Sequence, residues 1–144
     1  IKKYNEGKGK VTRKLYNARP ERKLAMKDWH SKPKNKEKAK KTRTNKRLEV
    51  LQVLSKRLSN SDIPCCNCCG LNTHTQFLSI DHISGRKSMD TESELKKLGY
   101  SWKFAADRLV KWLLDNNFPK GFQILCHNCN SAKGFYGKCP HERK

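Results

Sequence analysis

The chain has 144 residues, enough for one domain with an extension, and its 33 Lys and Arg against 13 Asp and Glu give a net charge of +20. No stretch of the sequence approaches the roughly 18 apolar residues of a membrane-spanning helix, and its first residues contain no apolar signal-peptide core. We therefore expect an intracellular protein that is neither secreted nor inserted in a membrane.

The positive charge is concentrated in the first part of the chain. Residues 1–60 carry 21 Lys and Arg against 5 Asp and Glu, whereas residues 61–144 carry 12 against 8. A block this basic is typical of a segment that binds a polyanion, most commonly nucleic acid. A membrane surface is a weaker alternative, because the segment lacks the apolar face of an interfacial helix. Residues 1–43 are predicted to be a nucleic-acid-binding arm, largely disordered when free because apolar anchors are few.

An amphipathic helix is predicted over residues 44–58, within a second segment of residues 44–60. Leucines recur there at helical spacing, with basic residues on the other faces. These leucines are Leu48, Leu51, Leu54 and Leu58. Asn60 and Pro64 are expected to end the helix.

Residues 61–144 are predicted to form a third segment, a small α+β domain. Short apolar runs at residues 77–80 and 122–125 are typical of strands. A short helix is expected from Asp90 to Gly99, a longer one over residues 102–117 and a last one over residues 127–135. The two strands and the last helix make a ββα unit, which the other helices interrupt as an insertion.

Seven cysteines include two units with the spacing of a zinc knuckle. An odd number of cysteines and two adjacent pairs, in a Lys-rich chain, favour reduced thiols that hold metal over a disulfide scaffold. Four thiolates at Cys-x-x-Cys spacing are what a tetrahedral structural zinc requires. A zinc ion would also stabilise a domain that has few large apolar side chains.

Spacing alone leaves the zinc ligands open. The second knuckle offers Cys126 and Cys129, while the first offers either of two overlapping pairs, Cys65 with Cys68 or Cys66 with Cys69. A second metal site is a further alternative, with the ligands Cys65, Cys68, Cys139 and His141. Free cysteines can also be plain buried side chains.

Between the knuckles lies Ile80-Asp81-His82-Ile83, and the second knuckle continues from Leu125 to Lys133. With these motifs the chain resembles the HNH endonuclease family in its zinc-stapled form, over roughly residues 62–141. Residues 134–141 are similar to the tails of phage and intron-type members, whose setting would be an infected cytoplasm or an organelle. The resemblance implies a ββα-metal core. In the family register the second cysteine precedes a glycine, which selects Cys66, Cys69, Cys126 and Cys129 as the zinc ligands.

The resemblance also implies a catalytic site. His82 would be the general base, Asp81 and Asn130 would hold a catalytic Mg²⁺ or Mn²⁺, and Lys133 would contact phosphate, as in the HNN variant of the family. The chain has Gly121 where the family motif usually has its middle Asn. The group that orients His82 is thus unassigned, with Asn116, Asn117 or a backbone carbonyl as candidates. His127 is either a phosphate contact or a plain surface histidine.

Two functions follow from the sequence. The first is a metal-dependent DNA endonuclease that nicks or cuts duplex DNA, with the basic arm binding backbone phosphates. The second is a structural nucleic-acid-binding protein derived from the HNH fold, in a ribosome or another large ribonucleoprotein, with structured RNA as its partner. The length and charge of the arm favour the second, while the presence of Asp81, His82, Asn130 and Lys133 favours the first.

Overall fold

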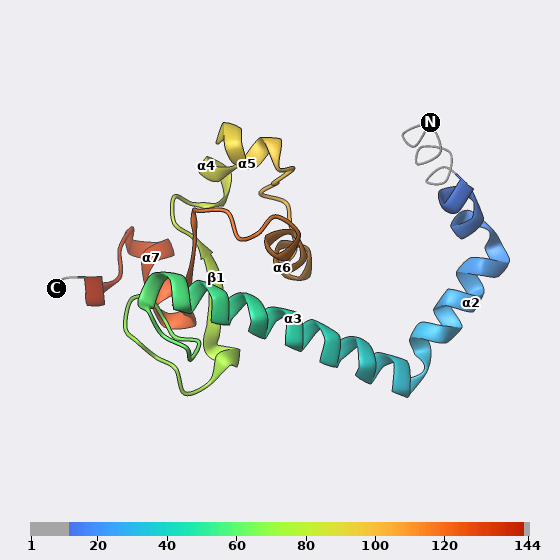
Figure 1. Ribbon diagram of the computed structural model, residues 1–144, viewed down its shortest axis with the longest axis horizontal. Coiled ribbons are helices and arrows are strands. Elements are labelled where there is room, and N and C mark those ends of the chain that lie inside the picture. The colour runs from blue at the N-terminus through green and yellow to red at the C-terminus, as the bar shows by residue number, and fades with distance from the viewer. Residues whose placement is uncertain (1–11, 143–144) are drawn as a thin grey trace. The chain divides into compact units, whose positions relative to one another are not determined.

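The computed structural model describes residues 12–142 (Figure 1). The chain divides into two compact units, Ile1–Thr42 and Arg43–Lys144. The second unit combines helices with a small sheet, so the α+β prediction is confirmed at this level. In the part of the chain that the structure describes, no helix is both long and apolar enough to cross a membrane.

The described part of the first unit is helical. Residues 12–18 form one helix, α2 spans Pro20–Ser31, and α3 begins at Pro33 and runs to Ser59 in the second unit. The expectation of a largely disordered arm differs from this structure. Both prolines lie at the start of a helix, where a missing N–H costs nothing, and Lys, Glu, Ala and Arg are strong helix formers. No residue of α2 is buried, so local propensity rather than packing accounts for this helix.

The second unit is built on a two-stranded antiparallel ribbon. Strand β1 (Leu78–His82) pairs with β2 (Phe122–Cys126), and β2 leads directly into α7 (His127–Tyr136), which contacts both strands. Between the strands lie α4 (Arg86–Met89), α5 (Ser93–Lys97) and α6 (Ala106–Asp115); the short 3₁₀ turns η1 (Thr75–Phe77) and η2 (Pro140–Glu142) lie outside the ribbon. The predicted strands and last helix are therefore present, and the short helix expected from Asp90 is replaced by α4 and α5.

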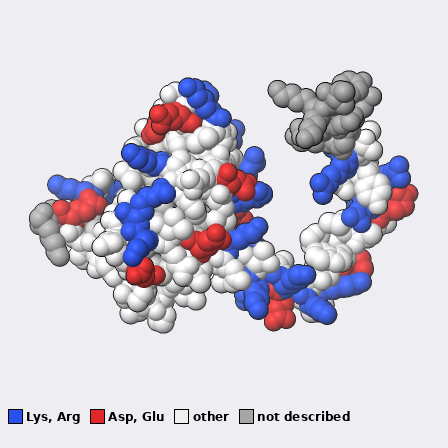
Figure 2. Space-filling model, viewed as in Figure 1, with Lys and Arg blue, Asp and Glu red and all other residues white. Residues whose placement is uncertain are grey.

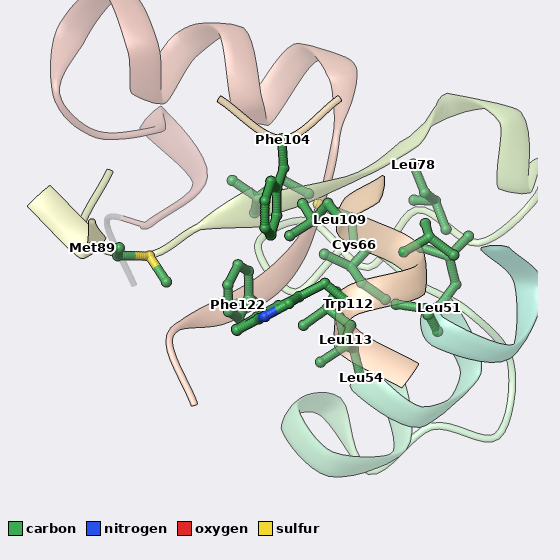
Figure 3. Packing of buried hydrophobic residues seen from close by; sticks show 14 of the residues in the cluster. Leu51, Leu54, Cys66, Leu78, Met89, Phe104, Leu109, Trp112, Leu113 and Phe122 are labelled. Atoms are coloured by element: carbon green, nitrogen blue, oxygen red, sulfur yellow. The ribbon is translucent and has the colours of Figure 1, made fainter. Parts of the chain in front are cut away.

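One apolar core holds this unit together, as Figure 3 shows. It combines side chains of α3, both strands and α6, among them Val50, Leu51, Leu54, Leu78, Leu109, Trp112, Leu113, Phe122 and Ile124. Of the leucines predicted to line the buried face of α3, Leu51 and Leu54 are buried, while Leu48 and Leu58 are exposed. The core is small, and three cysteines of the predicted zinc set lie within it: Cys66, Cys126 and Cys129.

Candidate metal centre and adjoining cleft

The first knuckle is a tight turn fixed by backbone hydrogen bonds. The Gly70 N–H donates to the carbonyl of Cys66 at 2.9 Å, and the Cys66 N–H donates to the carbonyl of Leu71 at 2.9 Å. Gly70 has φ +77°, a left-handed conformation that favours glycine. The Asn67 N–H donates to the carbonyl of Ile124 at 2.8 Å, which ties the knuckle to β2. The turn therefore directs Cys66 and Cys69 toward the end of the ribbon.

The second knuckle coincides with the junction of β2 and α7. Cys126 is the last residue of the strand and the N-cap of the helix, and its Sγ accepts a hydrogen bond from the Cys129 N–H at 3.4 Å. Capping by the side chain of Cys126 satisfies one of the free amides at the start of α7. The strand end thereby brings Cys126 close to Cys129, about one helical turn along the chain.

The four thiols of the predicted set converge. The Sγ atoms of Cys66, Cys69, Cys126 and Cys129 all lie within 4.8 Å of one another, and those of Cys69 and Cys126 are 3.8 Å apart. A tetrahedral zinc with Zn–S bonds of about 2.3 Å requires sulfur atoms about 3.8 Å apart. This cysteine cluster could therefore hold a zinc ion.

The alternative first pair does not join this cluster. Cys65 is buried, its N–H donates to the Ser55 Oγ at 2.9 Å, and it belongs to neither group of converging ligands among the described residues. Cys68 belongs to a second group, with Cys129, Cys139 and His141. The second site predicted from the sequence thus recurs with one change, Cys129 in place of Cys65.

Burial affects the chemistry of the thiols. Burial, followed by the neighbouring thiols, raises the pKa of Cys129, and burial also raises the pKa of Cys69. A zinc ion binds the thiolate form, so its uptake would release these protons. Metal binding at this cluster is therefore expected to weaken as the pH falls.

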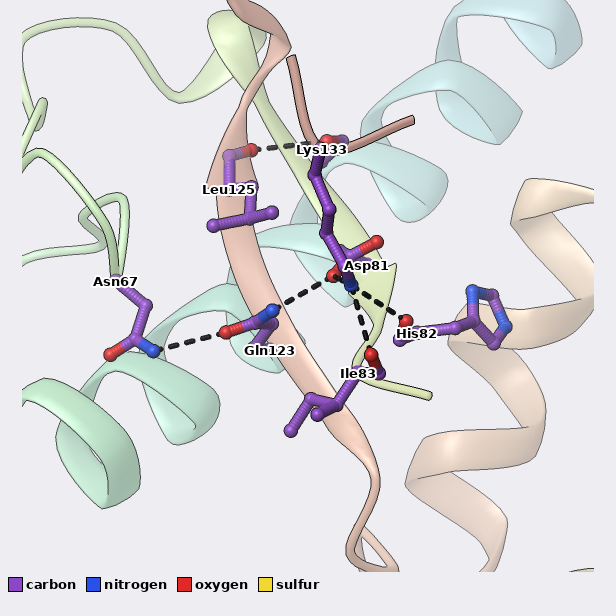
Figure 4. Close-up of polar contacts among 8 residues, drawn as sticks. Asn67, Asp81, His82, Ile83, Gln123, Leu125 and Lys133 are labelled. Atoms are coloured by element: carbon purple, nitrogen blue, oxygen red, sulfur yellow. Dashed lines mark hydrogen bonds and ion pairs between the residues drawn. The ribbon is translucent and has the colours of Figure 1, made fainter. Parts of the chain in front are cut away.

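Asp81 lies at the centre of a polar network on the two-stranded ribbon (Figure 4). Its Oδ2 accepts a hydrogen bond from Gln123, the residue opposite it in the ribbon, at 2.9 Å and forms an ion pair with the Lys133 Nζ at 2.5 Å. Lys133 also donates to the carbonyls of His82 at 3.0 Å and Ile83 at 3.1 Å. The Lys133 ammonium group thus links α7 to the C-terminal end of β1.

This network reaches the first knuckle through two residues that the sequence reasoning missed. The Asn67 Nδ2 donates to the Gln123 Oε1 at 3.0 Å, and the Gln123 Nε2 then donates to Asp81. These two hydrogen bonds follow only from the strand register, which places Gln123 opposite Asp81. The position of the Asp81 carboxylate is therefore coupled to the knuckle.

His82 has a different environment from Asp81. Successive strand residues face opposite sides, and Figure 4 shows the imidazole directed away from the Asp81 carboxylate. His82 is 7% exposed, and its ring packs against Phe122 and Tyr100, with ring centroids 5.1 and 5.9 Å away. Burial, followed by the positive charge of Arg86, lowers the pKa of His82 to about 4. At neutral pH the imidazole is therefore uncharged.

The aromatic rings, rather than a hydrogen bond, hold His82 in place. Among residues 12–142 no group hydrogen-bonds to its ring nitrogens, and the Asn116 Nδ2 donates to the carbonyl of Trp112 at 2.8 Å instead. At Gly121 a Cβ atom would lie 2.7 Å from the Met89 Cε, and φ is +104°. The backbone therefore disfavours an asparagine at that position.

All four predicted catalytic residues line one cleft of about 920 Å³: Asp81, His82, Asn130 and Lys133. His127 lines it as well. Three further basic residues contribute, Arg47, Arg86 and Lys103, and Asp107 adds a carboxylate. The guanidinium of Arg47 donates to the carbonyls of Thr75 and Leu78, so part of this positive charge is fixed by the backbone. A polyanion would meet mainly positive charge in this cleft.

No protein family model, no curated protein and no solved structure matches this chain. Its class therefore rests on its own residues. It is a mixed α+β protein with a two-stranded ribbon, a following helix and a cysteine cluster that could hold a zinc ion.

Proposed function

We propose that the chain is a metal-dependent DNA endonuclease of the HNH type, which hydrolyses phosphodiester bonds in duplex DNA. The observation that carries the proposal is that Asp81, His82, Asn130 and Lys133 all line one cleft. Asp81 and His82 end β1, while Asn130 and Lys133 lie in α7. The cysteine cluster would join the first knuckle to the junction of β2 and α7, and β1 pairs with β2. We therefore interpret β1, β2 and α7 as a ββα-metal core with a Cys₄ zinc.

Asp81 and Asn130 offer oxygen ligands of the kind that Mg²⁺ and Mn²⁺ prefer. Both described hydrogen bonds to the Asp81 carboxylate end on Oδ2, and none of the residues 12–142 donates to Oδ1. The donor set thus fits a divalent ion. When bound, such an ion would neutralise charge on the scissile phosphate and the leaving oxygen.

His82 would act as the general base. A neutral imidazole can take a proton from water while the water oxygen forms a bond to phosphorus and the bond to the leaving oxygen breaks. The pKa of His82, which burial lowers to about 4, leaves the ring neutral at pH 7 but makes it a weaker base than a histidine with its ordinary pKa. Its ring nitrogens have no described hydrogen-bond partner. Lys133 would hold Asp81 in place and add positive charge next to the phosphate.

The basic arm would supply affinity for the DNA backbone. Figure 2 shows Lys and Arg side chains along α2 and α3. Residues 34–41 alone contain five lysines and one glutamate. Phosphate contacts of this kind bind without sequence preference and weaken with salt.

A structural nucleic-acid-binding protein of a ribosome or other ribonucleoprotein is the second candidate function. Two observations favour it. The three donor positions of Lys133 are already used by Asp81 and two backbone carbonyls, and the His82 ring is enclosed by aromatic side chains on the other face of the ribbon. In such a protein the ion pair would replace the divalent ion, and structured RNA would be the partner.

Plasmid cleavage by the zinc-loaded full chain tests the proposal. We expect nicking or cutting in Mg²⁺ or Mn²⁺, and a loss of about 10²–10⁴-fold in rate for His82→Ala, the range usual for a positioned base. His74→Ala is the matched control, because His74 is exposed and does not line the cleft. No cleavage in either metal, together with salt-resistant binding of structured RNA, would favour the second function.

A further inference from the structure

Three ligand-type side chains beside the cysteine cluster have no role in a Cys₄ site. Cys68 lies in the first knuckle, while Cys139 and His141 follow α7. Cys139 is only 2% exposed although it lies in the short segment after the last helix. It belongs to the buried cluster of the core, and no other residue of the segment 137–142 is buried.

The backbone turns so that this segment returns to the cluster. Gly137 ends α7 in a left-handed conformation, with φ +77°, and its N–H donates to the carbonyl of Lys133 at 2.9 Å. The Glu142 N–H then donates to the carbonyl of Cys139 at 3.0 Å, which closes the turn η2. These two turns bring Cys139 and His141 next to Cys129.

The ligand atoms have the spacing of a tetrahedral metal site. The Sγ atoms of Cys68, Cys129 and Cys139 and a ring nitrogen of His141 all lie within 4.8 Å of one another. The His141 Nδ1 is 3.3 Å from the Cys139 Sγ and 3.5 Å from the Cys129 Sγ. With Zn–S near 2.3 Å and Zn–N near 2.0–2.1 Å, a tetrahedral zinc requires sulfur and nitrogen about 3.5 Å apart.

We propose that the chain binds a second zinc ion through Cys68, Cys129, Cys139 and His141, and that the Cys129 thiolate bridges it to the ion held by Cys66, Cys69 and Cys126. Cys129 belongs to both groups of converging ligands. A thiolate sulfur retains lone pairs after binding one zinc, so it can bind two. The result is a dinuclear centre with six thiolates and one imidazole.

Charge balance is compatible with two ions. The second zinc brings two positive charges, and its binding deprotonates two further thiols, Cys68 and Cys139. The total charge of the centre is therefore the same with one ion and four thiolates as with two ions and six. The second ion would also anchor the segment after α7, which otherwise buries only Cys139 among its described residues 137–142.

Metal stoichiometry tests this inference, and it does not depend on nuclease activity. Native mass spectrometry of the full chain, purified under reducing conditions, is expected to give two zinc ions per chain. Cys139→Ser and His141→Ala should each bind one ion and keep the near-ultraviolet circular dichroism of the folded core. Cys65→Ser is the matched control, because Cys65 is a buried cysteine outside both groups, and it should keep two ions.

Cadmium substitution tests the bridge itself. The ¹¹³Cd-loaded protein is expected to give two resonances that are coupled to each other through the Cys129 sulfur, and Cys139→Ser should give one uncoupled resonance. One metal ion per wild-type chain, or two resonances without mutual coupling, would overturn the bridged centre. A disulfide between Cys68 and Cys139 in the freshly reduced and repurified protein would overturn it too.

Discussion

The helical arm and the cysteine-bearing unit have opposite sources of order. In the arm, α2 buries no residue, and its helix depends on residues with high helix propensity and on prolines at helix starts. In the second unit a small apolar core includes buried cysteines of the two converging ligand groups. The comparison teaches that removing metal should unfold one region and leave the other largely unchanged.

Loss of the metal should have the largest effect. We expect Cys126→Ser, or chelation, to unfold residues 43–144, since structural zinc contributes on the order of 10 kcal/mol or more, comparable with the whole stability of a small domain. The near-ultraviolet signal of the buried Trp112 should vanish, while the helical signal of the arm persists. Cys65→Ser should keep both the Trp112 signal and the helical signal. An intact Trp112 signal in the metal-free protein would contradict the account.

Truncating a buried leucine of the second unit should lower stability by less than metal loss does, and truncating an exposed leucine of the arm should hardly change it. Leu113 of α6 is fully buried, so Leu113→Ala is expected to lower the free energy of unfolding by about 2–5 kcal/mol. Leu24 of α2 is 68% exposed, so Leu24→Ala should change it by less than about 0.5 kcal/mol. Urea unfolding of both variants measures the contrast. Equal losses of unfolding free energy in the two variants would mean that Leu24 is buried in solution.

Protonation of His82 at low pH should lower the free energy of unfolding by about 3 kcal/mol. Because its pKa is lowered from 6.5 to about 4 in the folded state, the unfolded chain binds the proton first as the pH falls. Stability from this residue is therefore complete above pH 6.5 and lost between pH 6.5 and about 4, at roughly 1.4 kcal/mol per pKa unit.

The control for this titration is His82→Phe, which keeps an aromatic ring between Phe122 and Tyr100. Urea unfolding of the zinc-loaded protein without added Mg²⁺ or Mn²⁺ should be less pH-dependent in the variant than in the wild type. Identical pH profiles would show that His82 titrates normally.

Removing a few charges of the arm should have the smallest effect, a modest loss of DNA affinity. Replacing Lys36, Lys38 and Lys40 by Gln should weaken binding of all duplex DNA sequences about equally, and should reduce the salt slope by roughly 0.9 for each lysine that contacts a phosphate. Stability should not change. Lys120→Gln in the second unit is the control. Fluorescence anisotropy at several salt concentrations measures the slope, and an unchanged slope would exclude these lysines from the DNA contact.

Sequence patterns were sufficient for features that depend on local spacing. The knuckle at Cys126 and Cys129, both strands and the last helix follow from short-range patterns, and the structure has them. The contacts of Lys133 with Asp81 and of Gln123 with Asp81 could not be predicted, because they depend on strand register and on the packing of α7.

Two other features were left undecided by the spacing of the residues. Spacing alone could not decide between the pair Cys65 and Cys68 and the pair Cys66 and Cys69, because both have the Cys-x-x-Cys spacing. The conformation of the turn directs only the second pair toward Cys126 and Cys129. The arm was expected to be largely disordered when free, because residues 32–41 have no apolar face, although Pro20 and Pro33 could each start or break a helix. Helix propensity and the positions of Pro20 and Pro33 were the signals that could have indicated the helices of the arm.

Binding of Mn²⁺ to the zinc-loaded chain tests the central claim most directly, because it distinguishes a metal site at Asp81 from a permanent ion pair with Lys133. Titration followed by the electron paramagnetic resonance signal of free Mn²⁺ should show one bound ion per wild-type chain. We expect Asp81→Asn to lose this ion and Asp107→Asn, another acidic residue of the same cleft, to keep it. Wild-type protein that binds no Mn²⁺, or Asp81→Asn protein that binds it as well as wild type, would contradict the account.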